Sequence, residues 1–289
     1  MDNDELSPLL RDKATDEPSV FRPEALIREA RRQKGLASAP VPPVCVLDPD
    51  GDIVRHLRRS GLTERSRTWP CYHSELDIFP LAGRQIGIVG CAVGAPYAVL
   101  VAEQMFALGC GLLISITSAG QIVPVGPPPY FVVIDRALRD EGTSHHYLPP
   151  AAFAEADPAL IADAVQALRR AQVPIQVGST WTTDAPFRET SRAIEDARSH
   201  GVLGVEMEAA ALYAFAAAHQ RRIVCLAHVT NQMGRDGEDF EKGEAGGAGE
   251  ALHVIEALAS SVPTTRSGRT GRAGRGGRGP AFRPSARWR

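Results

Sequence analysis

The chain has little of what marks a membrane or secreted protein. Its apolar runs all fall short of the roughly 20 residues that a membrane-spanning helix needs. Its N-terminus, MDNDEL, is acidic, whereas a secretory signal peptide begins basic and continues apolar. We therefore expect a cytoplasmic protein that does not contact a membrane.

Cysteine is scarce and scattered, which argues against two kinds of structure. None of the five cysteines stands in a C-x-x-C or histidine-rich spacing, so neither a zinc site nor a disulfide framework is expected. The adjacent His145 and His146 have no further ligand at metal-binding spacing, and we favour an unmetalled loop there over a metal site. The thiols that we expect to be reduced and partly buried are Cys45, Cys71, Cys91, Cys110 and Cys225.

The chain has no net positive charge outside its C-terminal end. The net charge is −2, but the last 28 residues carry eight arginines and no acid, so the remainder is near −10. An acidic body gives no electrostatic footprint for nucleic acid. The Arg/Gly-rich tail over residues 261–289 cannot bury a core, and we expect it to be disordered. It is either a solvated appendage or the one segment that could bind nucleic acid.

The middle of the chain has the composition of one large domain. Residues 1–19 are polar with charges of both signs and predict a disordered lead, which leaves residues 20–260 for the domain. Strand patterns alternate with helical patterns along this body and predict an α/β fold, a three-layer α/β/α sandwich with a central mixed sheet. The predicted core strands cover residues 44–47, 85–90, 111–121, 131–134 and 222–232, with another that begins at residue 177.

Two carboxylates interrupt an otherwise apolar stretch at residues 201–218. Glu206 and Glu208 precede a run of alanines with helical spacing, and neither has a Lys or Arg three or four positions away. A buried charge costs several kcal/mol unless it is paired. Acidic residues in a first helical turn are stabilised by about 0.3–1 kcal/mol through the helix dipole, and for Glu206 that role stays open. For Glu208 we favour a polyhydroxylated ligand such as ribose.

The sequence VEMEAAA at residues 205–211 resembles the ribose-binding signature of the nucleoside phosphorylase-I family. This family includes purine nucleoside phosphorylase, uridine phosphorylase and adenosylhomocysteine-type nucleosidases, and the resemblance extends over roughly residues 20–258. It implies that the central sheet is partly barrel-like. It also implies that Glu208 binds the ribose 2′- and 3′-hydroxyls, that Met207 packs on the sugar, and that Glu206 lies among the substrate-binding residues.

A glycine turn after the first strand is a candidate anion site. Gly51 and Arg55 lie where a strand ends and a helix begins, an arrangement that presents backbone N–H groups and a guanidinium to an oxyanion. An ordinary turn followed by a solvated arginine has the same pattern. Through the resemblance, the spacing GDxxR is similar to the first phosphate-contacting segment of the family, which favours the anion site.

Small hydroxylated residues end the strand at residues 111–121. Ligands gather at the carboxyl ends of strands in α/β sheets, so Thr117, Ser118 and Gly120 are expected to line the site. The resemblance makes Ser118 a phosphate ligand. It also shows two departures, because Ser115 stands where the family has its main phosphate arginine, and His73 stands where a neighbouring subunit contributes another. A protonated His73 would replace part of that charge.

Candidate contacts to the nucleobase come from two other segments. By resemblance, Phe187 stacks on the base and Arg188 contacts a carbonyl, although an ordinary core Phe and a salt-bridged Arg would fit the same residues. Asn231 lies at the end of the last core strand and can hydrogen-bond the base, but unlike an aspartic acid it cannot protonate it. An amide there suits a pyrimidine or a 6-oxopurine better than adenine.

The resemblance implies a homo-oligomeric enzyme, a dimer or trimer of dimers, that cleaves the N-glycosidic bond of a nucleoside with inorganic phosphate. Its expected catalytic residues are Glu208, Arg55 and Asn231, and its expected products are a base and ribose 1-phosphate. No metal or organic cofactor is expected, and phosphate is the co-substrate. Two alternatives stay open: a nucleosidase that uses water on the same fold, and a nucleoside-binding protein without activity.

Overall fold

The structure is a computed structural model that describes residues 8–262 except 10, 12, 233–241 and 243. Just under half of the predicted disordered lead and nearly all of the predicted tail therefore lie outside the described residues. The described part of the lead contains turns but neither helix nor strand. None of the helices in the described ranges is both long and apolar enough to cross a membrane.

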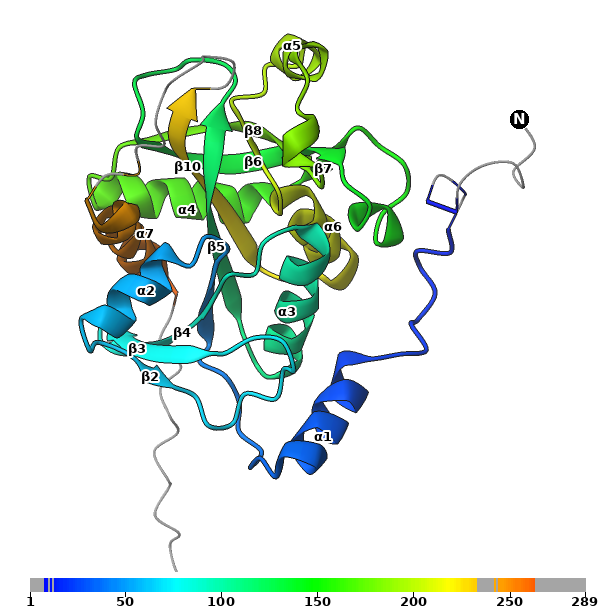
Figure 1. The fold of residues 1–289 in the computed structure, drawn as a ribbon, viewed down its shortest axis with the longest axis vertical. Coiled ribbons are helices and arrows are strands. Elements are labelled where there is room, and N and C mark those ends of the chain that lie inside the picture. Colours follow the sequence, from blue (N-terminus) through cyan, green and yellow to red (C-terminus); the bar gives the residue numbers. More distant parts are fainter. Residues whose placement is uncertain (1–7, 10, 12, 233–241, 243, 263–289) are drawn as a thin grey trace, which may run out of the picture.

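A mixed ten-stranded sheet forms the centre of the molecule (Figure 1). Its order is β10, β6, β8, β9, β5, β1, β4, β3, β2, with β7 paired to β6. The strands are β1 (Val44–Asp48), β2 (Glu64–Arg65), β3 (Asp77–Leu81), β4 (Arg84–Gly90), β5 (Leu112–Gln121), β6 (Tyr130–Asp140), β7 (Phe153–Glu155), β8 (Ile175–Thr183), β9 (Gly204–Glu206) and β10 (Ile223–Gln232).

Five of these strands close into a barrel. β10 pairs with both β5 and β6, and the circuit continues through β8 and β9 back to β5. This closure confirms the barrel-like sheet that the resemblance implied. β5 changes partner along its length, because residues 112–115 pair with β1 whereas Gly120 and Gln121 pair with β9. Residues 116–119 therefore lie where the open part of the sheet separates from the barrel.

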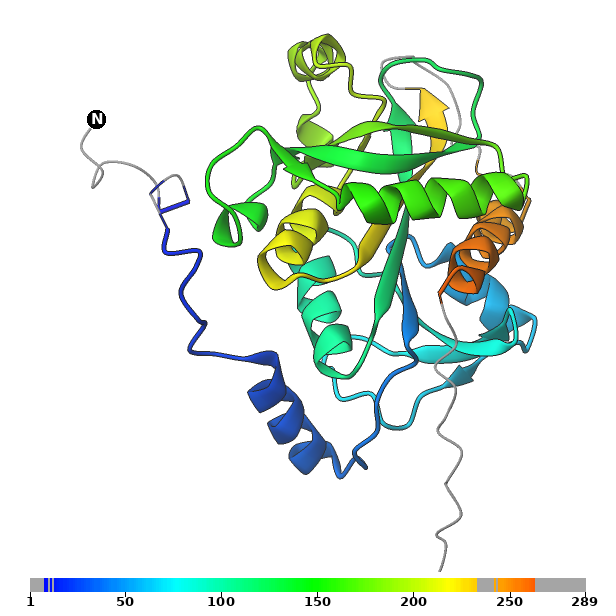
Figure 2. The ribbon, with the colours of Figure 1, turned by 180° about the vertical axis from the view of Figure 1, so that it is seen from behind.

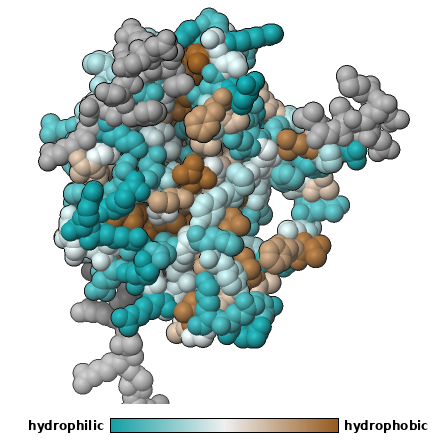
Figure 3. All heavy atoms as spheres, in the orientation of Figure 1, coloured by the Kyte–Doolittle hydropathy of each residue, from teal (hydrophilic) through white to brown (hydrophobic). Residues whose placement is uncertain are grey.

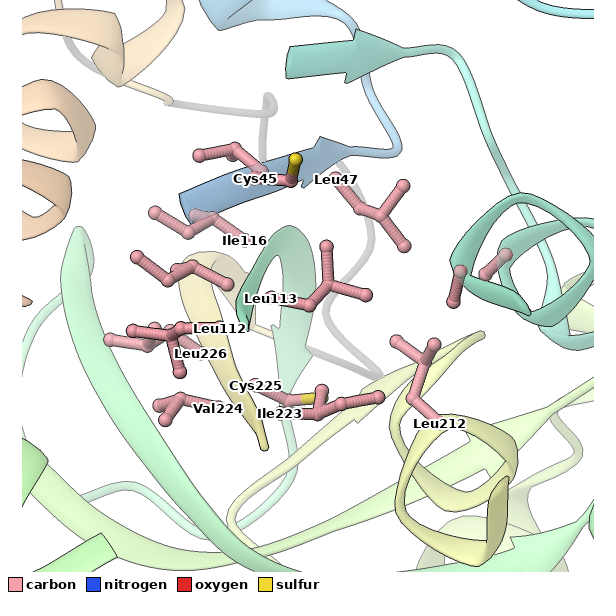
Figure 4. Close-up of a cluster of buried hydrophobic side chains, with 14 of the residues drawn as sticks. Cys45, Leu47, Leu112, Leu113, Ile116, Leu212, Ile223, Val224, Cys225 and Leu226 are labelled. Atoms are coloured by element: carbon pink, nitrogen blue, oxygen red, sulfur yellow. The ribbon is translucent and has the colours of Figure 1, made fainter. Parts of the chain in front are cut away.

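Strand β1 and most of β5 are buried on both faces, as expected for inner strands rich in branched apolar residues. In the close-up of the core, Leu47 of β1, Leu113 of β5 and Cys225 of β10 lie in one cluster with Leu212 (Figure 4). Their close packing fixes the strand ends that carry the polar residues described below.

Helices cover the sheet on two sides (Figures 1 and 2). They are α1 (Pro23–Lys34), α2 (Asp52–Arg59), α3 (Ala95–Ala107), α4 (Pro158–Arg170), α5 (Ser191–Ser199), α6 (Ala209–His219) and α7 (Ala248–Ser260). α3 packs on α6 and α1 on one side, whereas α7 packs on α2 and α4 on the other. This arrangement confirms the three-layer prediction.

Local sequence explains where α4 begins. Asp157 is its N-cap and accepts hydrogen bonds from the N–H groups of Ala159 and Leu160 at 2.9 and 3.3 Å, and Pro158 occupies the first turn. The prediction missed β2, β3, β7 and β9, which have two to five residues each. Strands this short carry too few residues for an alternating pattern to stand out.

Candidate active site

The candidate site lies where β1, β4 and β5 end and where α2, α3 and α6 begin. Gly51 follows β1, Gly94 follows β4, Thr117 and Ser118 lie on β5, and Glu208 connects β9 to α6. The face of the molecule around α2 is mostly hydrophilic, and apolar side chains show in the middle of the same view (Figure 3). Segments far apart in the sequence thus converge at the carboxyl ends of the strands, as the sequence predicted.

Glu208 is buried and only half satisfied. Glu208 is 1% exposed, and its Oε1 accepts a hydrogen bond from the Gly94 N–H at 2.7 Å. Its Oε2 has no partner among the described residues. Burial and the nearby Glu206 charge raise the pKa of Glu208 to about 8, while the Gly94 N–H and the Thr117 hydroxyl oppose the rise. A buried acceptor without a donor is a place where a ligand hydroxyl would bind.

Gly94 has two roles at the start of α3. Its φ of 88° lies in a region that favours glycine, and it caps the N-terminus of α3. The same turn aims its N–H at Glu208. Sequence analysis missed this contact because a backbone donor has no residue type that reveals it.

Glu206 has a structural role. It is 3% exposed, and its Oε1 accepts from the hydroxyls of Thr180 and Thr182 at 3.1 and 2.5 Å. Its Oε2 accepts from the N–H groups of Glu208 and Ala209 at 2.7 and 2.8 Å. Four donors therefore use the carboxylate within the protein. Of the two roles left open by the sequence, this geometry favours the helix terminus over substrate binding.

Three other predicted substrate contacts lie beside this pair. Met207 is half-buried between the two glutamates. Gly120 is buried and pairs with Val205 of β9 and with Asn231 of β10, next to an irregularity in the register. These pairings bring Asn231, which is half-buried, to the same edge of the barrel as the motif at residues 205–211.

Three of the four predicted phosphate residues come together. Gly51 has a φ of 75°, and a Cβ there would lie 2.6 Å from the Cys91 Sγ and 2.8 Å from an Arg55 Nη1, so only glycine fits. Arg55 Nη2 donates to the backbone oxygen of Asp50 at 2.7 Å and to Asp52 Oδ1 at 2.6 Å. Ser118 donates through both its N–H and its hydroxyl to the Asp50 carboxylate, at 2.8 and 2.9 Å.

His73, the fourth, is exposed outside this cluster. Its backbone oxygen accepts a hydrogen bond from the Tyr97 hydroxyl. A role for its side chain in phosphate binding across a subunit boundary stays a prediction. Ser115 is 1% exposed within β5, and its hydroxyl has no partner among the described residues. A serine carries no charge, so Ser115 does not replace the arginine that the resemblance places at this position.

Phe187 and Arg188 lie at the surface. Both belong to the short 3-10 helix Pro186–Arg188 and are exposed, Phe187 at 99%. The alternative that Phe187 is an ordinary core residue is therefore wrong. Its role as a base-stacking residue stays a prediction.

The five cysteines are free, and Cys91 is the exposed one. Within the described ranges, no three or more His, Cys, Asp or Glu side chains are grouped so that they could hold a metal ion.

The family model of the phosphorylase superfamily matches residues 43–260. Among curated proteins, the chain is 27% identical over 216 residues to uridine phosphorylase of Thermococcus kodakarensis, covering 65% of this chain and 78% of that one. It is 30% identical over 169 residues to the DeoD-type purine nucleoside phosphorylase of Bacillus subtilis, covering 56% and 72%. It spans 64% of the corresponding enzyme of Proteus mirabilis at 26% identity.

A solved structure supports the fold independently. Uridine phosphorylase from Vibrio fischeri, complexed with 6-hydroxy-1-naphthoic acid, superposes with a TM-score of 0.62 over 78% of this chain and 91% of that chain. At 22% identity this likeness shows the fold alone. The family match, however, covers most of the chain: this protein belongs to the phosphorylase superfamily.

Proposed function

We propose that this protein is a nucleoside phosphorylase, a pentosyltransferase that cleaves the N-glycosidic bond of a nucleoside with inorganic phosphate. The observation that carries the proposal is the unpartnered Oε2 of buried Glu208. Glu208 lies at the same edge of the sheet as Ser118 of β5 and Arg55 of α2. Relatives named uridine phosphorylase and purine nucleoside phosphorylase support it.

The sugar is the part of the substrate that Glu208 fits best. A carboxylate accepts hydrogen bonds from two adjacent hydroxyls, and here one oxygen is already oriented by Gly94. Cleavage of a glycosidic bond passes through an oxocarbenium-like transition state. The negative charge of the ionised Glu208 carboxylate, held beside the sugar, stabilises that developing positive charge.

The phosphate is proposed to lie against Arg55 and Ser118, with Gly51 giving room for its close approach. A guanidinium, a backbone N–H and a hydroxyl are the donors that a phosphate oxygen prefers. Asn231 is proposed to hydrogen-bond a pyrimidine or a 6-oxopurine, with Phe187 and Arg188 of the short 3-10 helix after β8 as further base contacts. The uridine and purine relatives leave both classes of base open.

A nucleosidase that uses water is the second candidate, and one observation favours it. Carboxylates already engage the donors of Arg55 and Ser118, and Ser115 and His73 stand where relatives are expected to have arginines. We also propose that the protein is a cytoplasmic homo-oligomer and needs no metal or organic cofactor.

The test is a panel of nucleosides that includes uridine, inosine and adenosine, each incubated with and without phosphate. The proposal predicts release of base from uridine or inosine that depends on phosphate. Release at the same rate without phosphate would favour the nucleosidase, and binding without turnover in either condition would contradict both enzymes.

A further inference from the structure

The donors of Ser118 converge on a carboxylate of the protein itself. The N–H donates to Asp50 Oδ2 at 2.8 Å and the hydroxyl donates to Oδ1 at 2.9 Å, so one carboxylate takes both donors. Ser118 follows Asp50 by 68 residues, and this contact connects β5 to the turn after β1. Carboxylate and phosphate oxygens accept hydrogen bonds from the same kinds of donor, which makes Asp50 the present occupant of an anion site.

Arg55 is engaged in the same way. Its Nη2 donates to Asp52 and to the Asp50 backbone oxygen, which anchors the guanidinium beside the Asp50 turn. Lys242 also approaches both carboxylates, with its Nζ 2.8 Å from Asp52 and 3.5 Å from Asp50. The two cations are thus matched by two nearby carboxylates before any ligand is bound.

The surroundings disfavour a second anion while Asp50 stays in place. Asp48, Asp50 and Asp52 line one pocket together with Ser118 and Lys242. The Asp50 side chain is 28% exposed, so its charge is only partly screened by water. Its field reaches Glu208, whose pKa is raised by burial, by Glu206 and, to a smaller extent, by Asp50.

We propose that Asp50 is an internal competitor of phosphate and sets the affinity of the site for its anionic co-substrate. The inference rests on the proposed function for the identity of that co-substrate. Phosphate must displace the Asp50 carboxylate from Ser118 before it can take the same two hydrogen bonds. Water is neutral and meets no such repulsion. Asp50 therefore also determines the fraction of cleavage events in which water, and not phosphate, is the nucleophile.

The test is the affinity for inorganic phosphate, measured by isothermal titration calorimetry on the full-length protein. Asp50→Ala removes the competitor and frees both Ser118 donors, so we expect phosphate to bind about tenfold or more tightly than to the wild type. Asp50→Asn keeps the size of the side chain but removes its charge, and we expect a smaller gain in the same direction. Asp163→Asn, which removes an exposed carboxylate on α4, is the matched control and should change nothing.

Kinetics then separate this inference from the proposed function. In a phosphorolysis assay, Asp50→Ala should lower the KM for phosphate by a similar factor while the KM for the nucleoside stays unchanged. Phosphate affinity that is unchanged or weaker in both folded Asp50 variants would overturn the inference, whatever the activity. Tighter phosphate binding in the variants, with no nucleoside cleaved by any form of the protein, would uphold the inference about Asp50 and contradict the proposed function.

Discussion

The carboxylate of Glu206 accepts a hydrogen bond from the backbone N–H of Glu208 at 2.7 Å. The two glutamates of this short motif therefore have different roles. Glu206 uses both oxygens to hold the start of α6 and the end of β8, and this fixes the backbone from which the Glu208 side chain projects. Glu208 keeps one oxygen for a ligand.

Replacing Glu208 should abolish activity and spare the fold. In Glu208→Gln an amide replaces a carboxylate that would accept two charge-assisted hydrogen bonds, each worth about 1.5–3 kcal/mol, so kcat/KM for the nucleoside should fall at least roughly a hundredfold. The melting temperature should stay the same or rise, because the variant no longer buries an ionisable group beside Glu206.

Glu206→Gln is the control for that experiment. Its amide nitrogen cannot accept from the two threonines or from the start of α6, so at least one of these pairs of hydrogen bonds is lost. We expect a lower melting temperature and a destabilisation of about 1–3 kcal/mol. A fully active Glu208→Gln enzyme would contradict the assignment of the sugar site.

The pH dependence of kcat/KM should report on Glu208 in the free enzyme. Its pKa of about 8, raised by burial and by Glu206, means that the acid is protonated below that pH and ionised above it. If the ionised form binds the ribose hydroxyls, kcat/KM rises with pH up to about 8. In the complex the hydroxyls favour the carboxylate, so kcat should depend less on pH over the same range. A kcat/KM that is flat or falls between about pH 6 and 8 would refute this role.

Asp48 should make the folded state less stable as pH rises. It is 2% exposed, and burial raises its pKa from 3.8 to about 7 even though the N–H groups of Val54 and Gly51 donate to it. The folded chain therefore keeps a proton between pH 3.8 and 7 that the unfolded chain has released, and the stability that this proton provides is lost as pH rises through that window.

Urea denaturation of the wild type and of Asp48→Asn near pH 5 and pH 8 measures the effect. The stability of the variant relative to the wild type should increase by up to roughly 2.7 kcal/mol from pH 5 to pH 8, because about two pH units of the titration window lie above pH 5. The same difference in unfolding free energy at both pH values would show that Asp48 titrates normally.

Sequence patterns were enough for the scaffold and for the most specific motif. The alternation of strands and helices predicted the layers, and the VEMEAAA run predicted a buried site at Glu208. Closure of the barrel followed from resemblance, because it depends on β5 changing partners at Ser115 and again at Gly120. No local periodicity records such a change.

What the sequence could not reveal are contacts across long separations. Gly94 reaches Glu208 through a backbone N–H over 114 residues, and Asp50 meets Ser118 over 68. Glu206 and Glu208 occupy the same apolar context in the sequence, and their roles differ through contacts such as those of Thr180 and Thr182 with Glu206. Phe187 is an aromatic residue of the kind that lines ligand pockets, yet it is exposed in the structure.

The Arg/Gly-rich tail should be dispensable for folding and turnover. Residues 263–289, which lie outside the described residues, have almost nothing apolar to bury. Val262 is kept in the truncated protein because its backbone oxygen accepts a hydrogen bond from Arg84 at 2.9 Å. Deleting residues 263–289 should leave the melting temperature and nucleoside turnover unchanged and remove any salt-sensitive binding to RNA. A truncated chain that fails to fold would show that the tail docks on the domain.

The product of the reaction tests the central claim most directly. The wild-type protein would be incubated with uridine or inosine and inorganic phosphate, and the phosphorus species followed by 31P NMR while the free base is quantified. The proposed function predicts a new sugar phosphate ester, ribose 1-phosphate, in equal amount to the released base. Free ribose without a phosphate ester, formed at an unchanged rate when phosphate is omitted, would contradict it.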